Sequence, residues 1–309
     1  MSKHAQTNTS DAQAVATAEV ESHAFLHDQR KRRIAADIGT YILLGILSVI
    51  WLLPIVWIFL ESLNKDTTPY QATFFPVQYS FDNYIGLFTD RKVLDFPHMF
   101  LNTFIIAIFT CLISVFFVLS VAYCMSRMRF RGRRAFMNFV LVIGMFPGIM
   151  SVVAIYFILK AMGLTSDGMT IVALILVYSA GTGAGFYVMK GFMDTIPTSL
   201  DESAMLDGCT RWQVFTKIII PMSRPMIVYQ AITGFLIPWL DFVMAKVIAR
   251  TQDNYTASLG LWLMLDKEYI NSWFGRFAAA AVLISIPIAI LFMVMQRFYN
   301  ESMAGAVKG

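Results

Sequence analysis

Long apolar runs constrain the fold of this chain more than any other feature of its sequence. A transmembrane helix needs about 20 consecutive, mostly apolar residues. Six stretches meet that requirement, at about Gly39–Leu60, Met99–Met125, Ala135–Leu159, Gly168–Met189, Pro225–Ala245 and Phe277–Gln296. Five of the six contain no Asp, Glu, Lys or Arg. The remaining one, Pro225–Ala245, contains only Asp241. The sequence therefore predicts an all-α integral membrane protein with six transmembrane helices.

The composition excludes the main alternatives to a membrane protein. Hydrophobic residues make up 57% of the 309 residues and charged residues only 14%, against about 25% charged in an average soluble protein. Too little polar surface remains to cover a soluble core of this length, and disordered chains are polar and charged. Three widely spaced cysteines, Cys111, Cys124 and Cys209, indicate neither a disulfide framework nor a metal site.

The distribution of basic residues predicts the orientation in the membrane. Sixteen of the 24 Lys and Arg residues lie in the N-terminal tail, in the loops after the second and fourth stretches, and at the C-terminus. Basic residues favour the cytoplasmic side, so both termini are expected there. We accordingly divide the chain into a cytoplasmic polar tail, residues 1–38, and a membrane domain, residues 39–309. We interpret the cluster Arg127–Arg134 as a topology signal that touches lipid headgroups, in preference to a partner site.

No pattern in the sequence supports catalysis. The phosphate-binding pattern GxxxxGK[ST] does not occur, and neither metal-ligand spacing nor a nucleophilic triad can be traced. The glycine run Gly181–Gly185 lacks the third glycine of GxGxxG, because Phe186 occupies that place. Gly181 and Gly185 instead predict a close contact between two membrane helices. A net charge of +4 and the apolar composition give no reason to expect a nucleic-acid partner.

The loop at about 190–224, predicted to be cytoplasmic, has helix signals of its own. Ser199 and Glu202 have capping-box spacing, which predicts a short helix from near Leu200. Gly208 suits the left-handed position that ends such a helix. Thr210 and Gln213 repeat the capping-box spacing and predict a second helix from Arg211, limited by Pro221. The expected arrangement is a helix, a glycine corner and a second helix.

Both short helices carry apolar residues at helical spacing, Leu200 with Ala204, and Trp212 with Phe215 and Ile219. Two interpretations of these faces stand equally. The faces pack on membrane-proximal helices of the same chain, or they dock into a groove of a soluble partner.

This loop resembles the EAA loop of ABC importer permeases. That pattern is E-A-A, three residues, G, nine residues, and I-x-L-P. Here Glu202, Ser203 and Ala204 are followed at the same spacing by Gly208 and by the run Ile218–Pro221. Ser203 replaces the middle letter and Ile220 replaces Leu. The spacing is kept over a window of 20 residues.

The resemblance covers nearly the whole chain beyond residue 38 and is to six-helix carbohydrate permeases of the maltose and maltodextrin type. Other matching stretches are Ser126–Gly132, Met145–Val153, Lys190–Ile196, Phe277–Ala281 and Ala304–Gly309. The resemblance implies the type I ABC importer permease fold in a bacterial inner membrane. It also implies three partners: a dimer of cytoplasmic ABC ATPases, a second homologous permease and an extracytoplasmic sugar-binding protein. No cofactor is expected on this chain, since ATP and magnesium would bind the ATPase.

The resemblance also assigns site residues. In that family the EAA helix sits in a cleft of the ATPase and transmits its closure to the membrane helices. The residues implied for this coupling are Glu202, Ser203, Ala204, Asp207, Gly208, Ile218 and Pro221. Glu202 would be the charged docking contact, Gly208 the corner and Pro221 the exit, while the small Ala204 would allow close approach. The C-terminal Lys308 and Gly309 are further candidates for contact with the ATPases.

The path of the sugar is harder to assign. Asp241 follows Pro238, and an acid inside a membrane span is functional by default. An equal alternative is that Asp241 binds backbone groups freed by Pro238. Tyr229, Gln230 and Asn102 are polar enough to face a pathway or to bond between helices. Maltodextrin is the expected sugar. Another oligosaccharide is one alternative, and a self-sufficient secondary transporter is another, which the single intramembrane acid disfavours.

Overall fold

The computed structural model describes residue 34 and the ranges 36–65, 74–91 and 94–306. It divides into two units, Met1–Trp57 and Ile58–Gly309. Within the described ranges all regular structure is helical, apart from one isolated antiparallel bridge between Asn64 and Tyr79. The all-α class is therefore confirmed. The predicted tail, residues 1–38, lies almost wholly outside the described residues, as do Lys308 and Gly309.

The first helix, Ala36–Ser62, crosses the boundary between the two units. In the first unit its large apolar side chains are exposed, among them Tyr41, Trp51 and Ile55. None of its most apolar stretch is buried inside the protein. A helix that is apolar on every side needs lipid or another membrane protein around it. The predicted first span is thus present as one helix.

Helix α3, Phe96–Arg127, joins the core of the second unit. The Asp95 carboxylate accepts a hydrogen bond from the backbone N–H of His98 at the start of the helix. At 1.5 Å per residue its 32 residues span about 48 Å, more than the roughly 30 Å of a bilayer core. Its buried residues contribute to all three hydrophobic clusters of the unit, with Met99, Ile106 and Val118 as examples.

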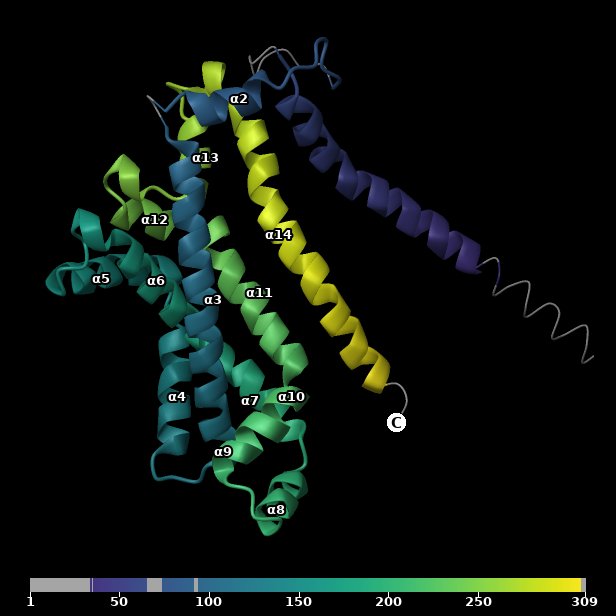
Figure 1. Ribbon diagram of the computed structural model, residues 1–309, viewed down its shortest axis with the longest axis vertical. Helices are drawn as coiled ribbons and strands as arrows, with labels where there is room; N and C mark the ends of the chain where they lie inside the picture. Colours follow the sequence, from purple (N-terminus) through teal and green to yellow (C-terminus); the bar gives the residue numbers. More distant parts are fainter. Residues whose placement is uncertain (1–33, 35, 66–73, 92–93, 307–309) are drawn as a thin grey trace, which may run out of the picture. The chain divides into compact units, whose positions relative to one another are not determined.

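Figure 1 labels the other helices of this unit. Five of them begin before the loop at 190–224: α2 (Asp82–Thr89), α4 (Arg133–Gly144), α5 (Gly148–Ala161), α6 (Thr170–Gly181) and α7 (Phe186–Thr195). The loop contains α8 (Thr198–Leu206), α9 (Arg211–Val214) and α10 (Ile220–Met222). The chain ends with α11 (Arg224–Leu240), α12 (Val243–Ile248), α13 (Ala257–Met264) and α14 (Ile270–Ala306).

Short 3-10 segments connect several of these helices. They are η1 (Asp167–Met169), η2 (Thr182–Gly185) and η4 (Gln252–Asn254). Together α6, η2 and α7 form one apolar span, Thr170–Thr195, which confirms a helix in the fourth predicted stretch. The helices Phe96–Arg127 and Ile270–Gln296 likewise confirm the second and sixth stretches.

The third predicted stretch is not one straight span. Helices α4 and α5 meet at an angle of 105° across a break at residues 145–147. Pro147 lacks an N–H, and the residue before a proline, Phe146, is driven away from helical geometry. The backbone of Pro147 is extended, with ψ of 124°. The prediction of a continuous helix over 135–159 was wrong, and the pair forms a broken or re-entrant span.

The fifth predicted stretch also ends early. Helix α11 stops at Leu240 after 17 residues, which corresponds to about 25 Å and falls short of a bilayer core. Asp241 adopts an extended conformation, and the chain turns into the separate helix α12. The described residues thus contain four helices long and apolar enough to cross a membrane, or five if α4 and α5 count as one span. Six such spans were predicted.

The predicted glycine contact is half right. A Cβ atom at Gly185 would lie 2.5 Å from Oε1 of Gln230, so η2 and α11 approach closely at this point. A Cβ atom at Gly181 would meet nothing within 4 Å. Gly181 lines a cavity instead. The close packing predicted for both glycines therefore occurs only at Gly185.

Candidate functional site

The loop between α7 and α11 forms a helix, a glycine corner and a second helix, as predicted. Gly208 follows α8 with a φ of +87°, a conformation that side chains with a Cβ rarely adopt. Its N–H donates to the carbonyl of Met205, and the N–H of Cys209 donates to the carbonyl of Ala204. This pair of hydrogen bonds is a Schellman motif, which satisfies the last carbonyls of α8 and turns the chain.

The two predicted capping boxes had different outcomes. At Thr210 both reciprocal bonds are present: its side chain accepts from the N–H of Gln213, and the Gln213 side chain accepts from the N–H of Thr210. The box predicted at Ser199 was wrong. Helix α8 already begins at Thr198, with Pro197 at the N-cap and no side-chain cap. Ser199 therefore lies inside the first turn, where its hydroxyl cannot act as an N-cap.

In the second half of the loop the helix changes from α to the wider π geometry before Pro221. Residues Phe215–Ile219 form a π-helical turn, η3, and Pro221 lies in the short helix α10. Proline cannot donate the backbone hydrogen bond of a regular helix, and π-turns are rare features that occur where regular pairing is interrupted. Pro221 is exposed, and Ile218 is half-buried against the nearest hydrophobic cluster.

One face of the loop packs against its own chain. Ala204, Phe215 and Ile219 are buried in a hydrophobic cluster with residues of α3 and α7. The rings of Tyr123 and Phe215 lie 4.5 Å apart between centroids. This arrangement supports the interpretation in which the apolar faces pack on membrane-proximal helices of the same chain. Ala204 points inward and does not lie on the exposed side of α8.

The loop also leaves four large apolar side chains exposed. Leu200, Met205, Leu206 and Trp212 are exposed, Leu206 by 89% and Trp212 by 68%. We call these four residues the outer apolar face. Large apolar side chains exposed outside a membrane-spanning segment are candidates for an interaction site. The structure therefore accommodates both interpretations of the loop, each for a different set of residues.

Exposed polar residues lie beside the outer apolar face. Glu202, Ser203, Asp207 and Gly208 are all exposed on α8 and at the corner. Of the seven residues implied for coupling, these four and Pro221 are open to a partner, whereas Ala204 and Ile218 contribute to packing. The patch combines apolar area with carboxylates, which favours a partner surface with an apolar groove and basic residues near its rim.

The C-terminal end of α3 holds this loop in place. Nε of Arg127 lies 2.9 Å from a carboxylate oxygen of Asp201 in α8, and both side chains are almost fully buried. The same guanidinium donates to the carbonyl of Ile196 over 2.8 Å. The hydroxyl of Tyr123 donates to the carbonyl of Arg211 at the start of α9. Two residues of α3 thus contact both short helices of the loop.

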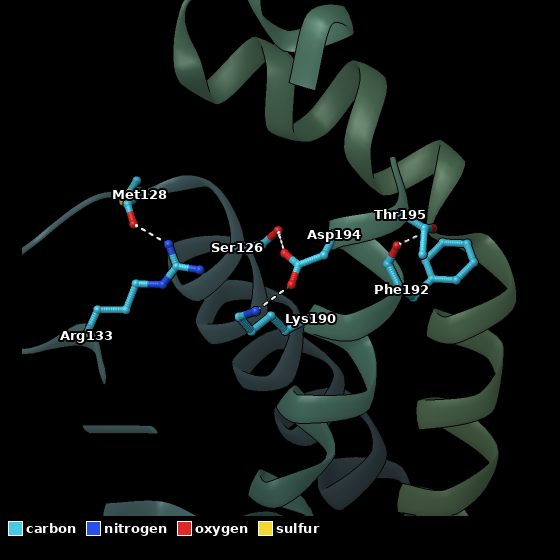
Figure 2. Close-up of polar contacts among 7 residues, drawn as sticks. All are labelled: Ser126, Met128, Arg133, Lys190, Phe192, Asp194 and Thr195. Atoms are coloured by element: carbon cyan, nitrogen blue, oxygen red, sulfur yellow. Dashed lines mark hydrogen bonds and ion pairs between the residues drawn. The ribbon is translucent and has the colours of Figure 1, made fainter. Parts of the chain in front are cut away.

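A second set of polar contacts joins α3 to α7, and Figure 2 shows it. The hydroxyl of Ser126 donates to Asp194 over 2.6 Å, and the ammonium of Lys190 pairs with the other oxygen of the same carboxylate. Nearby, the guanidinium of Arg133 donates to the carbonyl of Met128. The bond between Ser126 and Asp194 ties the last turns of α3 and α7 together.

Burial raises the pKa of Asp201 above its ordinary value, and the neighbouring Glu202 adds to this effect. Arg127 opposes it, but does not outweigh the loss of hydration. A buried ion pair of this kind contributes little net stability, because removing two charges from water costs about as much as their attraction returns. We therefore assign the pair a positioning role in which it fixes α8 against α3.

Sequence reasoning missed Arg127 and Asp201 as members of the site. Arg127 was grouped with the basic cluster that follows it, although it is the last residue of α3 and lies next to an apolar run. That position was the available signal, since a charged residue within the final turn of a long apolar helix needs a partner. No such signal marks Asp201, whose partner lies far away in the sequence.

Asp241 binds backbone groups, although not the ones that the sequence analysis named, and its role in a substrate path stays a prediction. Its carboxylate accepts hydrogen bonds from the N–H groups of Val243 and Met244, and from the hydroxyl of Tyr178 over 2.9 Å. The backbone groups it binds belong to the first turn of α12 and are not those freed by Pro238. Asp241 also lines a cavity of about 1000 Å³ between α5, α6 and α11.

That cavity is mostly apolar. Its lining includes one carboxylate, Asp241, and no Lys or Arg, together with the hydroxyls of Ser151 and Tyr178 and many aliphatic side chains. The other candidates for the substrate path lie elsewhere. Asn102 is buried and donates to the carbonyls of Asp253 and Tyr255, which is a structural role.

Gln230 and Tyr229 are neighbours on α11 with different surroundings. Gln230 is buried against Gly185, and Tyr229 is 46% exposed. The structure does not bring Asp241, Gln230 and Asn102 into one site. In the described part of the chain, no group of three or more His, Cys, Asp or Glu residues is placed to hold a metal ion.

The helical fold and its coupling-type loop define a class of protein, an integral membrane component of an ABC importer. A bacterial ABC transporter that imports the acidic polysaccharide alginate has the same fold. Its chain superposes with a TM-score of 0.70 over 85% of this chain and 95% of that chain, at 23% sequence identity.

Sequence comparison gives the family. Residues 118–305 match the family of binding-protein-dependent transport system inner membrane components. The galactooligosaccharides transport system permease protein GanQ of Bacillus subtilis is 34% identical over 92% of this chain and 100% of its own length. The maltodextrin permease protein MalD of Streptococcus pneumoniae is 30% identical over 90% and 98%, respectively. This chain belongs to that family, as a multi-pass inner membrane permease of the carbohydrate ABC transporters.

Family membership decides two earlier alternatives. The chain is a transport component and not an enzyme. A self-sufficient secondary transporter is excluded, because the family works with a binding protein in an ABC system.

Proposed function

We propose that this chain couples a cytoplasmic ABC ATPase dimer to sugar passage through the loop between α7 and α11. The observation that carries the proposal is the split character of this loop. Its inner face is fixed to α3 by Arg127 and by the cluster around Phe215, while the outer apolar face has no covering in the described chain. A surface that is fixed to the membrane helices and still exposed is suited to transmit a conformational change of a bound partner.

The proposed contact places α8 in a groove of the ATPase. Glu202 and Asp207 would meet basic residues at the rim, and Leu206 and Trp212 would enter the apolar part of the groove. Gly208 would set the angle between α8 and α9, since its φ of +87° fixes the corner. Movement of α8 would then reach the membrane through Asp201 and Arg127.

We further propose that the chain forms the translocation pathway together with a second, homologous permease. The first helix supports this, because within its own unit large apolar side chains such as Trp51 have no covering. The break between α4 and α5 also supports it, with Met145 and Ile149 each 83% exposed. Apolar area of this extent needs lipid or a membrane partner. Both termini and the coupling loop would face the cytoplasm, where an ATPase can reach them, and a sugar-binding protein would act on the other side.

The cargo we propose is a neutral oligosaccharide. Relatives named for galactooligosaccharides and for maltodextrin both match the chain over at least 90% of its length. The cavity beside Asp241 includes no basic residue in its lining, and an acidic polysaccharide would require one to balance its charge. Maltodextrin is the expected cargo, and a galactooligosaccharide is the alternative that the similarity to GanQ favours.

Uptake of radiolabelled sugar tests the proposal. The chain is expressed with the complete set of subunits of its system in cells that lack other oligosaccharide importers. Maltodextrin and a galactooligosaccharide are supplied separately and in competition. ATP-dependent uptake of either supports a neutral oligosaccharide, and preference between them selects the sugar. Uptake of alginate fragments alone would overturn the assignment.

A further inference from the structure

A cleft lined by arginines lies between the end of α3 and the start of α4. It has a volume of about 440 Å³ and is lined by Arg129, Phe130, Gly132, Arg133, Arg134 and Ala135. We call it the basic cleft. It is separate from the loop that we assign to coupling, and the proposed function does not use it.

The cleft coincides with the N-terminus of α4, a helix of 12 residues. Gly132 is its N-cap, has a φ of +92° and carries no side chain that could cap the helix. The first N–H of α4 with a helical partner is that of Phe136, which donates to the carbonyl of Gly132. Residues 133–135, which line the cleft, form the first turn of α4, where N–H groups have no acceptor four residues earlier within the helix, and such groups favour an anion.

The arginines around the cleft are short of counter-charges. Arg133 donates to the carbonyl of Met128. For Arg129, Arg131 and Arg134, which are exposed, the described chain provides no ion pair. An arginine guanidinium presents a planar fork of donors that fits a phosphate group in two hydrogen bonds. Arg129 and Arg134 thus supply two free forks beside a helix N-terminus.

The position of the cleft relative to the apolar helices indicates which phosphate-bearing ligand could reach it. Arg127 ends the long apolar helix α3, and α4 becomes apolar within a turn of Arg134. None of the residues of α4 is buried, and Phe136 and Phe139 are exposed, as expected for a helix in contact with lipid. Phe130, which is 47% exposed, sits between the arginines as an interfacial aromatic residue would. The cleft therefore lies at the level of lipid headgroups.

We propose that the basic cleft binds the phosphate of an anionic phospholipid of the cytoplasmic leaflet. Arg129 and Arg134 hold the phosphodiester, and the N–H groups at the start of α4 complete the site. The lipid chains lie along the exposed apolar side of α4. This occupant accounts for the charge, the open helix N-terminus and the exposed aromatic side chains together.

The sequence provides a matched control. Arg131 belongs to the same segment and is exposed, but it does not line the cleft. Replacing Arg129, Arg131 or Arg134 by Gln removes the same charge in each case. A diffuse attraction of basic residues to an anionic surface would respond equally to all three changes, whereas a defined site responds to two of them.

The test uses the full-length chain in a mild detergent with added phosphatidylglycerol and phosphatidylcholine, and native mass spectrometry measures the retained lipids. The wild-type chain is expected to retain phosphatidylglycerol preferentially. Arg129→Gln and Arg134→Gln should each weaken retention by about tenfold or more, and Arg131→Gln by less than about fivefold. Arg134→Lys, which keeps the charge and loses the fork, should fall between the wild type and Arg134→Gln.

Several outcomes would overturn the proposal. Equal losses in all three Gln variants would indicate diffuse electrostatic attraction only. Displacement of the lipid by inorganic phosphate would assign the cleft to a free anion. If instead these variants lost binding to the ATPase while lipid retention stayed the same, the cleft would be a protein contact. Thermal unfolding of each variant shows whether the chain is still folded, and exposed arginines should leave it unchanged.

Discussion

Arg127 and Asp201 join the end of α3 to α8 through a buried ion pair, an interaction that contributes little net stability. Both are nearly fully buried, and the guanidinium also binds the carbonyl of Ile196. Burial raises the pKa of Asp201 despite the nearby positive charge. Removing Arg127 takes away the charge that lowers the pKa of Asp201, so the pKa should rise further in its absence.

We expect Arg127→Ala to loosen α8 from α3. Removing one partner of a buried ion pair typically costs about 3–5 kcal/mol. The natural thiol of Cys209, half-buried beside the corner, reports the loosening. Its rate of reaction with a maleimide should rise in a variant that has no other cysteine.

Arg131→Ala is the control for this measurement, since Arg131 is exposed, lies in the same basic segment and does not line the basic cleft. It should leave the reactivity of Cys209 unchanged. If Arg127→Ala leaves the thiol as protected as in the wild type, the ion pair does not position α8.

Gly185 gives a second prediction at the residue scale, because a neighbouring glycine serves as its control. A side chain at Gly185 would collide with Gln230, and one at Gly181 would enter the open cavity. Gly185→Leu should lower the free energy of unfolding by about 1–3 kcal/mol, and Gly181→Leu should be nearly neutral. Thermal unfolding in detergent measures both.

The double variant Gly185→Leu with Gln230→Ala separates this clash from other effects. It should recover part of the stability lost in Gly185→Leu, because the atoms of Gln230 nearest to the new side chain are gone. No recovery would mean that the close approach of η2 and α11 does not depend on this pair.

Among the secondary-structure elements, α8 and α9 combine a fixed inner face with an exposed outer face. Phe215 is 8% exposed and packs on Tyr123, while Trp212, three positions earlier, is 68% exposed. The two rings are neighbours, with centroids 5.7 Å apart. The same short segment thus contributes to the core and to a surface that the described chain leaves uncovered.

These two aromatic residues predict opposite effects of the same substitution. Trp212→Ala should leave the stability of the isolated chain within about 0.5 kcal/mol of the wild type, but should reduce ATPase binding and transport. Phe215→Ala should destabilise the chain by about 3–5 kcal/mol. Thermal unfolding and ATPase co-purification distinguish the two. Full ATPase binding by Trp212→Ala would argue against the outer apolar face as the docking surface.

The corner of the loop makes a separate prediction. Gly208→Trp would place a β-carbon in a left-handed conformation and a bulky ring at the docking surface. Glu202→Lys reverses the charge that we assign to the ATPase contact. Both variants should insert into the membrane and allow ATP hydrolysis by the partner, but without sugar uptake. Normal uptake in both would contradict the coupling role of the loop.

The elements differ in how well the sequence predicted them, and backbone chemistry explains why. Thr210 and Gln213 form the capping box that their spacing predicts, because both of its bonds are local. The capping box predicted at Ser199 does not form, because α8 begins at Thr198 with Pro197 at the N-cap, and Ser199 therefore lies within the helix. Hydropathy alone predicted a straight helix across Pro147, because a sum over a window ignores the N–H that proline lacks and the restricted conformation of the residue before it.

In the candidate site, too, features that depend on neighbouring residues were predictable, whereas contacts between distant residues were not. The corner at Gly208 depends on one residue and its immediate neighbours, so its position was predictable. The pair of Arg127 with Asp201, and that of Tyr178 with Asp241, join residues distant in the sequence. Nothing in a single sequence specifies which buried charges or hydroxyls will meet in the folded protein. The polar candidates for a substrate path accordingly lie apart in the structure.

For the whole molecule, the distribution of basic residues predicts which side of the membrane each loop faces. The coupling loop, the basic cleft and both termini all depend on the same orientation. An ATPase can act on α8 only if α8 is cytoplasmic. The basic residues in the loops after the second and fourth apolar stretches predict that both loops, including the one with α8, lie on that side. One labelling experiment therefore tests all of these assignments together.

Cys209 is the natural probe for that experiment, because it lies beside Gly208 at the exposed corner. In a variant with Cys111 and Cys124 replaced by Ala, a membrane-impermeant maleimide should label Cys209 in inverted membrane vesicles but not in intact spheroplasts. Adding Lys267→Cys to a chain without native cysteines should reverse this pattern, since Lys267 is exposed in a loop predicted on the opposite side. Labelling of Cys209 from outside intact spheroplasts would invert the topology. The outer apolar face would then be out of reach of any cytoplasmic ATPase, and the coupling proposal would fail with it.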